Sequence, residues 1–265
     1  MSSTACRALL VSISMSIWIA AAGCGGSDKG AAASPASGES RAGDQPSAEE
    51  PGESGESGEE AEDGLEVSGT KGTLEAQQIQ AGVGRHASEL QACYQAQLSQ
   101  KKFLSGKLTV EVLVEKSGQV GRARMLDSDV GDWAVERCVL GVARRMTFPS
   151  PKGGDGQALF RVPLNFTGAR TPVEGWPEER IAAAVGDKRA ELDSCAGDGD
   201  APAGVIVTLY VGNRGVVKAV GFASADQPIA DGWADCAARA VAAWTLPDPQ
   251  GKIGKASFRY PPEAP

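Results

Sequence analysis

The stretch that decides the fold runs from residue 104 to residue 120 and reads LSGKLTVEVLVEKSGQV. Apolar side chains stand at every second position from Leu108 to Val114, which predicts a strand, and Gly118 marks the hairpin turn that follows. The same arrangement returns as VIVTLYVGNRGV from residue 205 to residue 216, with its turn at Gly215. The sequence therefore contains two copies of one hairpin.

The repeat extends beyond the hairpin. Cys138 precedes Pro149 by 11 residues, and Cys236 precedes Pro247 by 11. Matching spacings over this length indicate a duplicated domain, with the first copy at residues 71–168 and a diverged second copy at 174–262. Four positions at helical spacing also match: Ile79, Val83, Leu90 and Cys93 in the first copy, and Ile181, Val185, Leu192 and Cys195 in the second.

Each copy predicts the element order helix, strand, strand, helix, strand. The first helix starts near Thr73 in one copy and at Pro177 in the other, where acidic residues follow in the first turn. The third strand of the first copy runs from about Ala158 to Phe166 and again alternates. Two helices on a three-stranded sheet make an α+β unit, so the sequence predicts two tandem αββαβ units.

The first 23 residues are predicted to be a signal peptide, because Arg7 precedes a short apolar segment. Ala21-Ala22-Gly23-Cys24 resembles a bacterial lipobox, which implies cleavage before Cys24 and lipid attachment to it; an ordinary secretory signal is the alternative. Gly25 follows where an inner-membrane signal would have Asp. We therefore expect a lipid-anchored protein of the cell envelope, at the outer membrane and facing the periplasm or the surface.

Residues 24–70 are predicted to form a disordered tether, because Gly, Ser, Pro and acidic residues leave little apolar surface to bury. The segment holds 12 acidic and 2 basic residues, so the net charge of −8 of the whole chain resides there. The remainder of the chain is close to neutral. This balance excludes nucleic acid as a partner, since binding it needs a basic face.

Four cysteines remain once Cys6 and Cys24 are assigned to the N-terminal segment. Four cysteines allow three pairings, and the repeat selects Cys93–Cys138 and Cys195–Cys236, one disulfide inside each copy. Free buried thiols are the alternative. Each disulfide would close a loop of about 40–45 residues and stabilise the fold by roughly 3.5–4 kcal/mol in the chain-entropy description.

The first copy carries a resemblance in Cys93-Tyr94, Leu104 to Val110, Gly118-Gln119-Val120, Cys138 and Phe148-Pro149. These residues resemble the AgmX/PglI C-terminal domain, a family that is similar to the C-terminal domain of TonB and occurs in gliding-motility-associated and other envelope proteins. The second copy departs from the pattern, with Ala196 after its first cysteine and Leu246 in place of Phe148. A Pro/Lys-rich spanning segment is lacking, so the resemblance does not imply energy transduction.

Catalytic patterns are not found. The single histidine, His86, has Lys188 as its counterpart in the second copy, so triads and metalloprotease sites are excluded. Asp127-Ser128-Asp129 and Asp198-Gly199-Asp200 are interpreted as turns, and Arg144-Arg145 as a solvated helix face. We therefore predict no enzyme, no metal and no cofactor.

The leading hypothesis is a non-catalytic interaction or scaffold module that binds an envelope protein or peptide. An extended peptide would pair with an open sheet edge, and the candidate edge is the third strand at Ala158, Phe160, Arg161 and Val162. Pro163 favours an edge position there, although it also weakens pairing. The alternatives are an enzyme or carbohydrate-binding protein that uses a groove between the copies, and a structural spacer in a motility or secretion machine.

Overall fold

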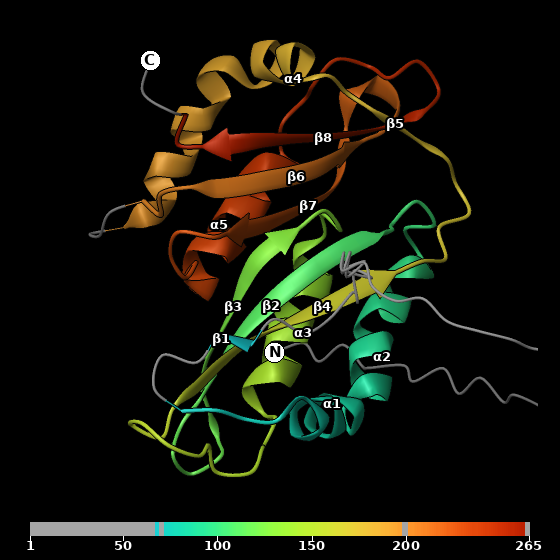
Figure 1. Ribbon diagram of the computed structural model, residues 1–265. Helices are drawn as coiled ribbons and strands as arrows, with labels where there is room; N and C mark the ends of the chain where they lie inside the picture. The colour runs from blue at the N-terminus through green and yellow to red at the C-terminus, as the bar shows by residue number, and fades with distance from the viewer. Residues whose placement is uncertain (1–66, 69–71, 198–200, 263–265) are drawn as a thin grey trace, which may run out of the picture. The chain divides into compact units, whose positions relative to one another are not determined.

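The computed structural model describes residues 67–68, 72–197 and 201–262 (Figure 1). Cys24, the signal peptide and nearly all of the predicted tether lie outside the described residues. Two four-stranded sheets with helices make a mixed α+β fold, which confirms the predicted class. The two copies belong to one compact unit.

The first copy contains three helices and four strands. Its strands have the order β1-β4-β2-β3 in the sheet. β2 pairs with β4 without a break, from Gly106 opposite Phe166 to Val114 opposite Ala158. In chain order the elements are β1 (Val67–Ser68), α1 (Ala76–Gly84), α2 (Ala87–Leu98), β2 (Gly106–Val114), β3 (Val120–Ser128), α3 (Trp133–Arg144) and β4 (Ala158–Phe166).

The second copy repeats this plan with the sheet order β5-β8-β6-β7. β6 pairs with β8 from Val205 opposite Tyr260 to Val211 opposite Gly254. The elements are β5 (Val173–Gly175), α4 (Glu178–Val185), the 3₁₀ helix η1 (Gly186–Ala196), β6 (Val205–Val211), the short 3₁₀ turn η2 (Asn213–Gly215), β7 (Val217–Ser224), α5 (Asp231–Ala242) and β8 (Ile253–Tyr260).

The alternation that predicted the central strands is confirmed by burial. Leu108, Val110, Val112 and Val114 are buried on one face of β2, and the equivalent side chains of β6 are buried as well. Because side chains alternate across a strand, this face packs against the helices and forms the core of each copy.

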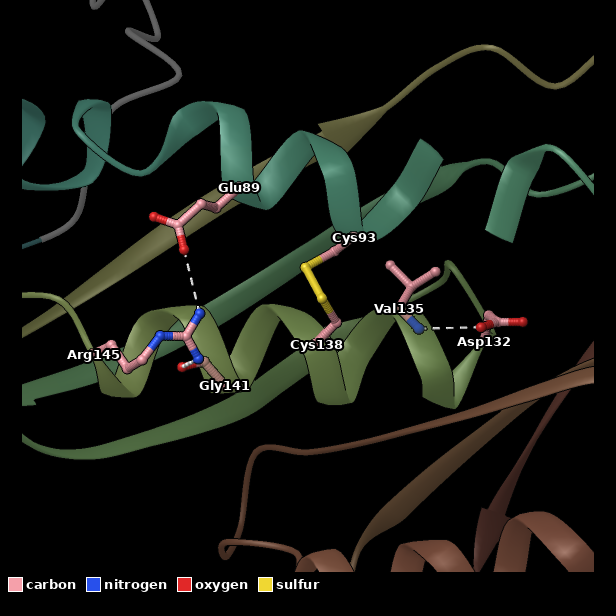
Figure 2. Close-up of a disulfide and its surroundings, with 7 residues drawn as sticks. All are labelled: Glu89, Cys93, Asp132, Val135, Cys138, Gly141 and Arg145. Atoms are coloured by element: carbon pink, nitrogen blue, oxygen red, sulfur yellow. Dashed lines mark hydrogen bonds and ion pairs between the residues drawn. A yellow bond between two sulfur atoms is a disulfide. The ribbon is translucent and has the colours of Figure 1, made fainter. Parts of the chain in front are cut away.

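Both predicted disulfides are present. Cys93 of α2 bonds Cys138 of α3, and Cys195 of η1 bonds Cys236 of α5, with Cα–Cα distances of 5.6 and 5.5 Å. Each bond therefore joins the two helical segments of its own copy, as Figure 2 shows for the first.

Two details of the prediction are wrong. Each sheet has a fourth strand, which is only two residues long in β1 and three in β5, too short to leave an alternating pattern in the sequence. The first helix is also interrupted: α1 and α2 are separated at Arg85 and His86, and in the second copy the helix continues as η1. Apolar spacing survives such an interruption, so the sequence did not reveal it.

Among the described helices, none has both the length and the apolar character that crossing a lipid bilayer requires. Helix ends are fixed by local contacts. At the start of α3, for example, the Asp132 carboxylate accepts a 3.1 Å hydrogen bond from the backbone N–H of Val135 (Figure 2).

Candidate protein-interaction edges

The two copies cover each other's inner sheet edge. β3 and β7, the last strands of their sheets, pack together, and α3 of the first copy also lies against β7. The guanidinium of Arg124 on β3 donates a 3.0 Å hydrogen bond to the carbonyl oxygen of Ala225. The ring of Trp133 lies 6.1 Å from that of Phe222 on β7. These two edges therefore face each other across the junction of the copies.

Glu136 is the centre of this junction and is fully buried. Its carboxylate accepts hydrogen bonds of 2.7 Å from the Ser128 hydroxyl and from the backbone N–H of Phe222. A Cβ atom at Gly221 would overlap the carboxylate, so the glycine makes room for it. Burial, with a smaller contribution from the charge of Asp132, raises the pKa of Glu136 to about 7 despite both hydrogen bonds.

Ion pairs surround the buried carboxylate. Asp235 of α5 accepts hydrogen bonds from the Trp133 indole at 2.7 Å and from Arg137 at 2.9 and 3.0 Å. Arg144 donates to both oxygens of Asp231, at 2.8 and 3.0 Å. This last pair raises the pKa of the Arg144 guanidinium and lowers that of the Asp231 carboxyl. The junction therefore uses charged groups from both copies.

The two arginines interpreted as a solvated helix face are partly exposed, but both are engaged. Arg144 pairs across the junction, whereas Arg145 lies within its own copy, between the carbonyl oxygen of Gly141 at 2.8 Å and Glu89 at 3.3 Å (Figure 2). The hydrogen bonds from His86 and Arg145 lower the pKa of Glu89. His86, whose Nδ1 lies 2.8 Å from Glu89, stands just before α2.

The prediction of a turn at Asp127-Ser128-Asp129 is wrong, because Asp127 and Ser128 are the last residues of β3 and pair with β2. Asp129 follows β3, where its carboxylate accepts a hydrogen bond from the backbone N–H of Lys107 and lies 3.8 Å from Lys255 Nζ. The segment Asp198-Gly199-Asp200 lies outside the described residues. No group of three or more His, Cys, Asp or Glu side chains is placed to hold a metal ion within the described ranges.

The predicted edge on β4 lies next to a segment of the same chain. β1 pairs with Leu159 and Phe160, and from Val162 to Phe166 no described strand pairs with the outer side of β4. Ala158, Phe160 and Val162 are buried, and Arg161 lies 4.0 Å from Glu111. Because these side chains pack in the core, a partner at this edge would mainly contact backbone groups of β4.

The second copy has an equivalent edge on β8. β5 pairs with Ile253 to Lys255 only, and between Ala256 and Phe258 no strand of the described chain lies on that side. A groove of about 880 Å³ opens there, between β8 and the segment that leads into α4. Its size is in the range that ligand sites occupy. No signal in the sequence singled out this groove, because its walls come from five separated segments of the chain.

The space between the copies is smaller. A cavity of about 220 Å³ lies there, and its lining includes Arg122, Arg124 and Arg144 but no carboxylate, histidine or cysteine. The tryptophans Trp133, Trp233 and Trp244 are buried and do not form an exposed aromatic face. This lining offers no acid–base pair of the kind that the alternative hypothesis requires.

No family model matches the chain, and neither the curated proteins nor the solved structures gave a match. The resemblance of the first copy to the AgmX/PglI domain stays a prediction.

Proposed function

We propose that this protein is a non-catalytic, lipid-anchored envelope protein whose two units bind another envelope protein or peptide by strand addition. The observation that carries the proposal is a difference between the sheet edges in what lies beside them. The inner edges β3 and β7 pack together, whereas the outer strands β4 and β8 are paired on their outer side over two and three residues. Unpaired backbone groups on an outer strand are a template for an added strand.

The composition of β4 agrees with this role. Pro163 stands in the outer strand, a position where the missing N–H is tolerated. Asn165 and Pro163 are exposed, while the alternate side chains Val162 and Phe166 hold the strand on the core. An added strand would gain backbone hydrogen bonds without disturbing the packing beneath. The predicted lipid on Cys24 and the acidic tether would hold the units near the membrane and give them reach.

Photocrosslinking in living cells tests the proposal. A photoreactive residue in place of Arg161, which follows the two positions paired with β1, is expected to capture one or a few envelope proteins. The matched control places the same residue at Gln91, which is exposed on the helical side at α2. Capture at Arg161 that does not exceed capture at Gln91 would contradict binding at this edge.

A further inference from the structure

The groove beside β8 wraps around the edge of the strand. The backbone N–H of Trp176 donates a 2.8 Å hydrogen bond to the carbonyl oxygen of Lys255, so the backbone of Lys255 faces outward. Backbone direction alternates along a strand, and Ser257 therefore directs its N–H and carbonyl into the groove. The pairing with β5 has ended at this point.

Side chains from both faces of the sheet line the same groove. Ile181 and Phe258 belong to the helix-covered face, whereas Ile206, Lys255 and Ser257 belong to the opposite face. A strand that continued the line of β5 would touch both sets, because its own side chains alternate. The shape thus fits an extended peptide better than a compact small molecule.

Two buried donors in this lining have no acceptor among the described residues. They are the indole Nε1 of Trp176 and Nε of Arg189. The Arg189 guanidinium lies 5.3 Å from the centre of the Phe258 ring, which favours a cation at that place. A buried donor without an acceptor is unfavourable, and most such groups in folded proteins are paired.

Charge narrows the class of ligand further. Lys255 brings a second cation to the groove, 3.8 Å from Asp129 and partly offset by it. Glu178 stands at the exposed rim. Arg189 has a guanidinium fork that suits a carboxylate.

We propose that this groove binds an extended segment of a partner protein that carries an Asp or Glu side chain. Its backbone pairs with β8 at Ser257, and its carboxylate accepts hydrogen bonds from the Arg189 guanidinium. The inference rests on the proposed role in peptide binding, but it assigns a separate site, in the second copy, and a ligand chemistry.

Fluorescence anisotropy tests this assignment on the mature chain with its tether, purified in mild detergent. The probe is a labelled, acetylated and amidated peptide, Lys-Thr-Val-Glu-Val-Thr-Ser, whose alternating β-branched residues favour an extended form. Its twin carries Gln in place of Glu. We expect the Glu peptide to bind about tenfold more tightly than the Gln peptide, because a charged acceptor makes the stronger hydrogen bond.

Arg189→Gln is expected to remove the preference for Glu over Gln. Lys188 is a neighbouring residue that does not line the groove, and Lys188→Gln removes one positive charge as Arg189→Gln does. This control should leave the preference intact. Arg189 Nε has no acceptor among the described residues, and the contact of the guanidinium with the Phe258 ring contributes about 1 kcal/mol, so Arg189→Gln should lower the thermal unfolding midpoint only modestly.

Equal affinity for the two peptides in the wild type, or a preference that survives Arg189→Gln, would overturn the assignment. Self-association that the peptide competes away would make a second copy of this chain the occupant, and would also overturn it. If the anisotropy experiment shows no preference for Glu while Arg161 captures a specific protein in cells, the proposed function is retained and only the assignment of the groove is rejected.

Discussion

The two copies share their spacings, yet equivalent positions at their junction carry different kinds of residue. Counted from the paired cysteines, Arg137 is equivalent to Asp235, and these two side chains bond each other. Glu136 is equivalent to Ala234, and both are fully buried. Counted along the paired hairpin strands, Arg124 is equivalent to Gly221, which leaves room for the Glu136 carboxylate.

Two of the contacts join equivalent elements, β3 with β7 and α3 with α5, as in a symmetric dimer, whereas α3 also lies against β7 without a comparable contact between α5 and β3. The residues themselves are complementary rather than identical. In a symmetric pair of first copies, Arg137 would meet another Arg137, and like charges would repel. Divergence between the copies therefore favours association of the first copy with the second copy of the same chain. This association leaves one outer sheet edge in each copy.

The largest expected effect comes from removing a disulfide in one copy at a time. The closed loops span 45 and 41 residues, so the loss should be about 4 kcal/mol of unfolding free energy in either copy. Urea unfolding of Cys93→Ala with Cys138→Ala, and of Cys195→Ala with Cys236→Ala, measures this. A far larger loss in the second copy would show that η1 depends on the covalent link more than α2 does.

The next effect is a pH dependence between about pH 5 and pH 8 that Glu136 of the first copy supplies. The pKa of Glu136 rises from 4.5 in the unfolded chain to about 7 in the folded one. The folded state therefore binds the extra proton, and the contribution is fully present below pH 4.5 and lost as pH rises through about 7. The difference should be about 3 kcal/mol, since each pKa step corresponds to about 1.4 kcal/mol.

Urea titrations at about pH 5 and about pH 8 should show this loss in the wild type, and Glu136→Gln should flatten it. An equal pH dependence in Glu136→Gln would assign the effect to another group. Glu136→Ala, which installs the residue of the second copy, leaves the Phe222 N–H without its acceptor and should weaken the junction at both pH values.

The smallest effect concerns the charge pair at equivalent positions. Arg137→Asp places two carboxylates at the junction and should reduce stability by about 1 kcal/mol, a modest value because the pair is partly exposed. Arg137→Asp combined with Asp235→Arg should recover most of the loss, as measured by a double-mutant cycle. The Trp133 indole makes recovery incomplete, because it donates to Asp235.

Much of the fold could be predicted because repetition acts as an internal alignment. Leu108 to Val114 and their counterparts predicted the central strands, and the matched cysteines predicted both disulfides. The short strands β1 and β5 were not predicted, because two or three residues are too few to show an alternating pattern.

The site was less accessible to sequence reasoning. The β4 edge was proposed from alternation and Pro163, but its pairing with β1 depends on a segment beyond the predicted unit. Trp176 and Arg189 line the same groove only after folding, and the sequence gives no sign that they will do so. The junction was missed for the same reason: Glu136 on a helix gives no sign that it will be buried against another copy.

The disulfides also determine how the chain would carry mechanical load. A pull on the tether reaches Cys93, crosses the sulfur bridge to Cys138 and continues to Cys195 and Cys236 in the same way. The bypassed loops contain β2, β3, β6 and β7, together with Glu136, Phe222 and Asp235 of the junction. Tension along the chain therefore could not draw out these closed loops while the covalent bridges are intact, even where noncovalent contacts outside the loops give way.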